Sequence, residues 1–420
     1  MKKSARRPLC WTVRQGVARG WRGWAGRRLV RILTLALLGL FEATSLVVAY
    51  AIAPLPSRAI SPTPTAGAKA QAVSSWRFHP PADAEVTPTP AATATAAPVA
   101  TAAPAVSVPP PRPFPFQAGV NVLVYGNDPA FAAKAATQLD HLAQLHVNSV
   151  SFVFPIYQNG WTASTVYADP AMTPTNTNIR TFIRLAHQRH LRVMIRPLMD
   201  EANFHPAGKW RGAIAPSIPS AWFASYTALV VGYGRLAQAE GAELFDIGTE
   251  FDSMQGYTQS WLNVIAAQRH VYSGQLTYSA NWAIQYPAFG WSVDFLSIDA
   301  FFPLAVPVNA TQPQLAAAWG RWIARASSIG YAYGKHVVFT ELGTTSEVGS
   351  FQSPWLWGHG TGLSLEAQRL YYAASCQVLK SHMGGLYWWE FDLQPLAAPL
   401  TDTSFNPQGK PAEAELGRCY

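Results

Sequence analysis

The chain has 420 residues, 49% of them hydrophobic and 12% aromatic, which suffices for one large domain with a sizeable core. The formal net charge of +8 is misleading, because residues 1–31 contain ten Lys or Arg and no Asp or Glu, while the remaining chain has 21 basic and 23 acidic residues. This near-neutral remainder offers no electrostatic attraction to nucleic acid. The chain has no CxxC motif and no cluster of Cys and His, so we expect neither a metal nor a cofactor.

Residues 32–53 form an apolar run after the basic leader of residues 1–31. The run is close to the roughly 20 residues that span a bilayer, and the leader keeps its own end in the cytoplasm. Two interpretations remain open. The long leader favours a transmembrane signal anchor, whereas Glu42 in mid-span and the small residues of Ala49-Tyr-Ala51 favour a cleaved signal peptide. Both predict that the rest of the chain lies outside the cytoplasm, on the cell membrane or secreted.

Residues 54–115 contain 15 of the chain's 33 Pro, among many Ala and Thr. Such a segment cannot bury enough apolar surface to order itself. We therefore predict a disordered, extended linker between the membrane segment and a folded domain of residues 116–420.

From residue 116 onward, apolar runs typical of buried parallel strands alternate with helical patterns. The runs are Ala118–Val124, Ser149–Pro155, Arg192–Leu198, Leu244–Ile247, Leu276–Ser279, Phe295–Ala300, His336–Thr340 and Gly385–Trp389. Eight strands alternating with helices over about 300 residues predict an α/β fold, the (β/α)8 TIM barrel. The competing doubly wound sheet usually has a Gly-rich phosphate loop after its first strand, and none follows Val124.

Two of these strands deliver a glutamate where they end. Glu250 follows Ile247-Gly-Thr, and Glu341 follows Val337-Val-Phe-Thr, 91 positions later. In a barrel this separation corresponds to about three strand–helix units, so the two glutamates face each other across the mouth where active sites lie. Glycosidic hydrolysis needs two carboxylates, one to protonate the leaving oxygen and one to attack or to activate water. The pattern favours catalysis over the alternative of two buried ion-pair partners.

Further candidates lie at the strand ends or in the loop after the third strand, and each has a structural alternative. Asp200 and Asp299 would either accept hydrogen bonds from sugar hydroxyls or cap helices. Trp210-Arg211 would either bind substrate or only stabilise the fold of the loop. Trp388 and Trp389 point to opposite faces because side chains alternate along a strand, so at most one of them faces the mouth. The predicted substrate-binding set is Arg196, Asp200, Trp210, Arg211, Trp282, Asp299, Trp388 and Trp389.

Cys376 and Cys419 lie in the predicted domain, while Cys10 lies in the leader. In an oxidising compartment the first two could form one disulfide. Two unpaired thiols are the alternative, because the sequence does not fix the distance between them.

Several short motifs, in order along residues 117–395, resemble those of glycoside hydrolase family 113 of clan A. They include Arg196-Pro-Leu-Met-Asp200, Trp210-Arg-Gly212, Ile247-Gly-Thr-Glu-Phe251, Leu276-Thr-Tyr-Ser-Ala-Asn-Trp282, Phe339-Thr-Glu-Leu-Gly343 and Gly385-Leu-Tyr-Trp-Trp389. The resemblance implies a retaining β-mannanase, with Glu250 as the general acid/base and Glu341 as the nucleophile.

The chain departs from the family pattern near this pair. Arg196 and Leu198 stand where the family often has Lys and His, and Ala213 stands where it has Glu. Phe301 stands where the family usually carries a Tyr that hydrogen-bonds the nucleophile. We therefore expect a retaining β-glycoside hydrolase that acts on mannan or a related β-1,4-linked polysaccharide. The alternative is a non-catalytic carbohydrate-binding barrel or a surface-polysaccharide assembly protein, which the missing Tyr hydroxyl favours.

Overall fold

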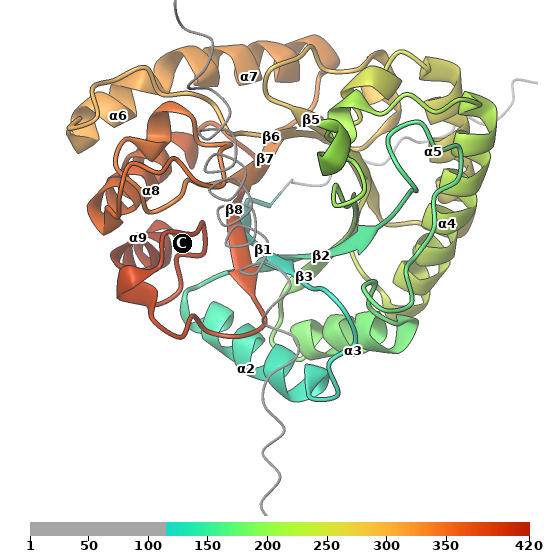
Figure 1. Cartoon of the computed structure of the whole chain (residues 1–420), viewed down its shortest axis with the longest axis horizontal. Coiled ribbons are helices and arrows are strands. Elements are labelled where there is room, and N and C mark those ends of the chain that lie inside the picture. The colour runs from blue at the N-terminus through green and yellow to red at the C-terminus, as the bar shows by residue number, and fades with distance from the viewer. Residues whose placement is uncertain (1–114) are drawn as a thin grey trace, which may run out of the picture. The chain divides into compact units, whose positions relative to one another are not determined.

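The computed structural model describes residues 115–420, which form a closed barrel of eight parallel strands inside a ring of helices (Figure 1). The strands pair in chain order, and β8 closes the barrel against β1. They are β1 (Gln117–Leu123), β2 (Ser149–Ile156), β3 (Arg192–Met199), β4 (Leu244–Thr249), β5 (Gln275–Asn281), β6 (Leu296–Asp299), β7 (Val337–Leu342) and β8 (Gly385–Asp392). The predicted TIM barrel and all eight predicted strands are confirmed.

The surrounding helices are α2 (Phe131–Gln144), α3 (Asn176–His187), α4 (Pro219–Glu240), α5 (Thr258–Val271), α6 (Gln312–Ala318), α7 (Gly320–Tyr333), α8 (Leu365–Leu379) and α9 (Pro411–Cys419). Local signals fix several of their ends. The Thr175 hydroxyl accepts a hydrogen bond from the Asn178 amide at the start of α3, and Gly241 ends α4 with a φ of 73°. The apolar face of α3, from Ile179 to Ala186, is buried.

One helical pattern of the sequence is divided in the structure. The residues from Leu315 to Ala326 share one apolar face, but α6 ends and α7 begins at Trp319. The indole of Trp319 is fully buried and donates a hydrogen bond to the Ser375 hydroxyl on α8. Anchoring this ring holds the junction of the two helices against α8.

Side chains inside the barrel form a stack of layers, as in other closed barrels of this size. An apolar floor lies near the start of the strands, and a second apolar layer lies near the mouth. The floor consists of Met194, Leu244, Phe295, Val338 and Tyr387, and the mouth layer consists of Val153, Leu198, Phe301, Trp389 and Phe405. Between Met194 and Leu198 on β3 lies Arg196, which marks a polar layer enclosed by the two apolar ones.

A disulfide joins Cys376 on α8 to Cys419 on α9, with Cα atoms 5.6 Å apart. This confirms the first of the two alternatives for these cysteines. Closing a loop between residues 43 positions apart stabilises the folded state by about 4 kcal/mol in the chain-entropy model. Such bonds persist in oxidising compartments.

The predicted leader, membrane segment and linker (residues 1–31, 32–53 and 54–115) lie outside the described residues, apart from Pro115. Among residues 115–420, no helix combines the length and apolar character that a membrane span requires.

Candidate active site

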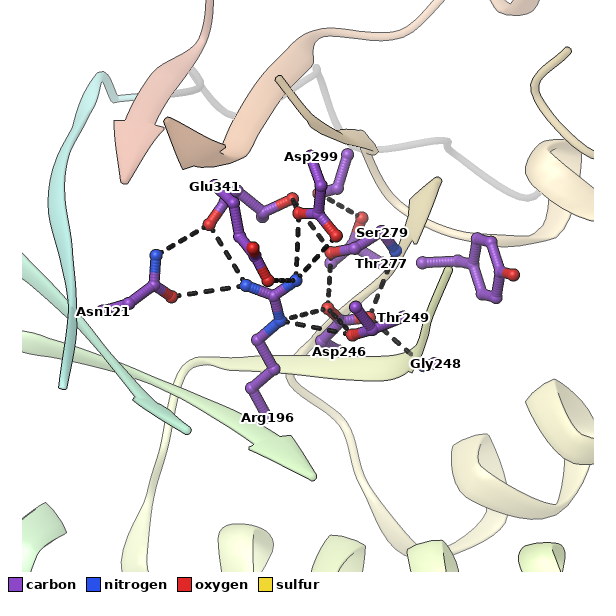
Figure 2. Close-up of polar contacts among 12 residues, drawn as sticks. Asn121, Arg196, Asp246, Gly248, Thr249, Thr277, Ser279, Asp299 and Glu341 are labelled. Atoms are coloured by element: carbon purple, nitrogen blue, oxygen red, sulfur yellow. Dashed lines mark hydrogen bonds and ion pairs between the residues drawn. The ribbon is translucent and has the colours of Figure 1, made fainter. Parts of the chain in front are cut away.

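The polar layer inside the barrel is built around the guanidinium of Arg196, which is fully buried. It lies within ion-pair distance of three carboxylates: Asp246 at 3.1 Å, Asp299 at 2.9 Å and Glu341 at 2.8 Å. Figure 2 shows these side chains converging from four strands, β3, β4, β6 and β7. One positive charge is therefore shared among three buried carboxyl groups.

Hydroxyl and amide groups complete this cluster. Asp299 accepts two hydrogen bonds from Arg196 Nη2, at 2.9 and 3.0 Å, and one from the Thr340 hydroxyl at 3.0 Å. The Ser279 hydroxyl donates to Asp246, and Arg196 Nη1 donates to the Asn121 side-chain oxygen (Figure 2). Asp246 and Asp299 therefore each accept hydrogen bonds, whereas Glu341 Oε1 has the ion pair with Arg196 but no hydrogen bond from the described residues.

Glu341 enters this cluster because strand β7 is irregular at that point. The β6–β7 register shifts by one residue, so that Asp299 is paired with Glu341 although Ile298 is paired with Phe339. A bulge of this kind redirects a side chain. Consequently both Thr340 and Glu341 reach the barrel interior, and Glu341 keeps 3% of its surface exposed.

Glu250 is placed at the mouth by an unusual backbone conformation. Its φ is 52°, in the left-handed region that costs a non-glycine residue on the order of 1–3 kcal/mol and is concentrated at functional sites. Gly248, two residues earlier, lies where a Cβ would come within 3.0 Å of the Trp261 and Tyr278 rings. The Ile247-Gly-Thr-Glu motif thus packs its glycine outward and turns its glutamate inward.

Arg211 holds the Glu250 carboxylate, with Nη1 donating to Oε2 at 3.0 Å. Its second terminal nitrogen lies 3.1 Å from Glu201. The preceding Trp210 ring covers Gly212, where a Cβ would lie 2.3 Å from the indole. The Trp-Arg-Gly motif therefore folds its loop and presents Arg211 to Glu250 at the same time.

Burial determines the protonation of this site. Burial, followed by the charge of Asp299, raises the pKa of Glu250 to about 8, and the Arg211 charge opposes this rise. Burial also raises the pKa of Glu341 and of Asp299, and the Arg196 charge opposes both rises. Burial raises the pKa of Asp246 to about 6. With a pKa of about 8, Glu250 is mostly a neutral acid at neutral pH.

The structure corrects three predicted substrate contacts. Arg196 and Asp299 have no exposed surface and lie below the mouth layer, where Arg196 contacts both Asp299 and Glu341. Trp388 faces outward and stacks on Tyr372 of α8 with ring centroids 4.0 Å apart, because alternate β8 side chains point away from the interior. Trp389 belongs to the mouth layer.

The other predicted residues lie around the mouth. Asp200 follows β3 and accepts a hydrogen bond from the Tyr125 hydroxyl at 2.8 Å. Trp282 follows β5 and is half-buried. No group of three or more His, Cys, Asp or Glu in residues 115–420 is arranged to hold a metal ion.

Comparison with known proteins agrees with this geometry. The sequence model of Glycoside Hydrolase Family 113 matches residues 126–410, which is more than half of the chain. The chain belongs to glycoside hydrolase family 113, and it is a glycoside hydrolase. The resemblance read from the motifs is thereby confirmed. No curated protein sequence matches the chain.

Solved structures of family 113 enzymes share the fold. The β-mannanase AaManA from Alicyclobacillus acidocaldarius, solved in complex with ManMIm, is 25% identical. The alignment covers 72% of this chain and 96% of that one, with a TM-score of 0.64. A second family 113 β-1,4-mannanase is 21% identical over 73% of this chain and 99% of its own, also with a TM-score of 0.64.

Proposed function

We propose that this family 113 enzyme is a retaining β-mannanase that uses Glu341 as nucleophile and Glu250 as general acid/base. The observation that carries the proposal is a pair of buried glutamates at the mouth of the barrel, each held by its own arginine. Glu250 lies 3.0 Å from Arg211, Glu341 lies 2.8 Å from Arg196, and burial raises the pKa of Glu250 to about 8, which suits a general acid. Two such carboxyl groups are what double displacement at a glycosidic bond needs.

The chemistry proceeds in two steps. In the first, a Glu341 oxygen bonds to the anomeric carbon while the glycosidic bond breaks, and the leaving oxygen takes the proton of Glu250. In the second, ionised Glu250 removes a proton from water, whose oxygen bonds to the anomeric carbon and releases Glu341. The cycle restores both carboxyl groups.

Glu341 must be ionised for the first step, although burial raises its pKa. Arg196 supports one negative charge among three carboxyls, and burial raises the pKa values of Asp246 and Asp299 as well. The Arg196 guanidinium lies 2.8 Å from Glu341 and opposes the rise in its pKa, so it favours the ionised form of the nucleophile. Arg196 thus takes over the stabilisation of the nucleophile that the Tyr hydroxyl absent at Phe301 would otherwise give.

The mannan preference rests on the family and on its solved β-mannanases. Export and membrane tethering are part of the proposal; the Cys376–Cys419 disulfide supports an oxidising compartment. The enzyme's partners would then be an external polysaccharide and the membrane that anchors it.

The stereochemistry of the product tests the mechanism. Digestion of β-1,4-mannan, followed by proton NMR within the first minutes, is expected to show the β-anomer of the new reducing end before mutarotation supplies the α-anomer. Parallel digests of glucan and xylan test the preference for mannan. First appearance of the α-anomer would contradict double displacement.

The pH dependence tests the assignment of Glu250. The acid must be protonated for the first step, so kcat/KM on mannan is expected to fall as pH rises through about 8, the pKa to which burial raises Glu250. With an aryl β-mannoside whose leaving group needs no proton, this basic limb should become weak. A profile on mannan that stays flat well above this pH would contradict the assignment.

A further inference from the structure

The loop between β7 and α8, residues 343–364, carries an unusual share of exposed apolar side chains. Of the 12 large hydrophobic residues that are exposed in the described part of the chain, five lie here: Val348, Trp355, Leu356, Trp357 and Leu363. Trp355 is 40% exposed and Trp357 is 53% exposed. Exposed apolar surface concentrated in one segment marks a binding surface rather than ordinary surface composition.

This surface continues into the active-site mouth. Trp355 stacks on Trp282, with ring centroids 5.2 Å apart and an interplanar angle of 29°. Trp357 meets the ring of Phe405 at 5.1 Å and that of Trp389 at 6.5 Å, both edge to face. Phe405 and Trp389 belong to the mouth layer. The loop therefore extends the aromatic surface of the mouth outward from the ends of β5 and β8.

The loop is held in place by a buried carboxylate. Glu347, 5% exposed, accepts hydrogen bonds from the backbone amides of His359 at 2.8 Å and Gly360 at 3.0 Å. The Thr345 hydroxyl also donates to Glu347, at 3.1 Å, and the Val348 amide donates to the Gly362 carbonyl at 3.0 Å. These bonds close both ends of the loop around the tryptophans. A surface organised before binding loses less entropy when a ligand arrives.

We propose that Trp355 and Trp357 form a tryptophan platform that binds pyranose rings of the polysaccharide beyond the ring held at the two glutamates. The proposal rests on the proposed function, since it assigns further sugar positions to the same site. An indole offers a flat apolar face with a negative quadrupole, which suits the C–H face of a pyranose. Because the tryptophans are continuous with the mouth, we favour as ligand a polymer that extends outward from Glu341, rather than a separate binding partner.

Direct binding tests the platform without relying on turnover. In the full chain carrying Glu341→Gln, Trp355→Ala and Trp357→Ala are each expected to weaken binding of soluble β-1,4-mannan by about tenfold, because a ring covers on the order of 60 Å² of each indole at ~25 cal/mol per Å². Trp355→Phe and Trp357→Phe, which keep an aromatic face, should lose less. Isothermal titration or affinity electrophoresis provides the measurement.

Trp291 is the matched control. It is 63% exposed, and it lies at the opposite end of the barrel, against Tyr333 at the end of α7. Trp291→Ala should leave mannan binding unchanged. With otherwise native enzyme, the platform variants should raise KM on polymer by a larger factor than KM on a short aryl mannoside.

The outcomes separate this inference from the proposed function. Unchanged polymer affinity in both alanine variants overturns the platform, even where the enzyme hydrolyses mannan. If the protein binds mannan, the alanine variants lose that binding and no glycan is hydrolysed, the platform is supported and the proposed function is overturned. If the alanine variants lose binding to phosphatidylcholine vesicles but keep their affinity for mannan, the platform is overturned and the loop is a membrane-binding surface.

Discussion

Replacing Glu341 by Gln is expected to lower kcat on mannan by roughly four to six powers of ten, the loss that removal of a nucleophile from a concerted catalytic group produces. The amide keeps the shape of the side chain but cannot form the bond to the anomeric carbon. Glu250→Gln should lower kcat on mannan by about two to four powers of ten, the contribution of a positioned general acid. Initial rates of reducing-sugar release provide the measurement.

Both variants should remain folded. Glu341→Gln removes one of three carboxyls that share the Arg196 charge, so its thermal midpoint should equal or exceed that of the native enzyme. Glu243→Gln is a matched control. Glu243 lies just before β4, whereas Glu250 lies just after it, and Glu243 accepts a hydrogen bond from the Val193 amide at the far end of the barrel. This variant should retain activity. Mannan hydrolysis that survives Glu341→Gln would overturn double displacement.

Azide distinguishes the two roles further. In Glu341→Ala the anion occupies the space of the missing carboxylate and attacks from the nucleophile's face, which should yield the α-mannosyl azide. In Glu250→Ala the glycosyl-enzyme forms from an activated aryl mannoside, and azide attacks it without needing a base, which should yield the β-azide. The opposite pair of products would exchange the two assignments.

The barrel could be predicted from the sequence because its strands are buried on both faces and therefore appear as continuous apolar runs. The predicted start of β2 at Ser149 and of β8 at Gly385 match the structure. The predicted ends were less accurate. β7 continues through Glu341 to Leu342, and β8 continues to Asp392, because polar residues at the mouth still belong to the strand ladder.

The positions of the two glutamates could be predicted from the sequence, but the residues that hold them in place could not. Glu250 and Glu341 each follow a short apolar run, a pattern that local sequence carries. Arg196 was expected at the mouth, yet it lies beneath Leu198 and Phe301, because the depth of a side chain in a barrel depends on register with distant strands. The bulge that turns Glu341 inward also depends on such pairing.

The tryptophans of the β7–α8 loop show the same limit. Trp355 and Trp357 stand in a Gly- and Ser-containing stretch without periodicity, so the sequence gives no hint of what they face. Their position follows from Glu347 closing the loop and from Trp282 and Phe405, which come from segments remote in sequence. Exposed aromatic residues in a long loop that follows a barrel strand would be the signal to examine.

Replacing Arg196 by Met is expected to destabilise the fold by about 3–5 kcal/mol, because the variant leaves buried carboxylates without their cation. Asp246, Asp299 and Glu341 would then have to take up protons, and activity should be lost with them. Denaturant unfolding provides the measurement. Arg192→Met is the matched control at the start of the same strand. It loses contacts to the Phe116 carbonyl and the Asn148 side chain, so the cost should be about 1 kcal/mol.

Arg196→Lys separates the charge from the geometry. A single ammonium cannot hold Asp299 through two hydrogen bonds and also reach Glu341, so it supports the nucleophile's charge less well. Because the cation opposes the rise in the pKa of Glu341, weakening it raises that pKa further. The acid limb of kcat/KM should therefore move to higher pH, and kcat/KM at neutral pH should fall by about a hundredfold, the effect of some 2.7 kcal/mol.

Phe301→Tyr in the Arg196→Lys background is the test specific to this chain. Phe301 lies in the mouth layer, at the position where the family usually has a tyrosine. A hydroxyl there would donate to ionised Glu341 and lower its pKa, which should return the acid limb toward its native position and recover part of kcat/KM. If Arg196→Lys does not shift the acid limb of kcat/KM, Arg196 only stabilises the barrel. A shifted limb that Phe301→Tyr reverses would establish that the guanidinium performs the work of the missing hydroxyl.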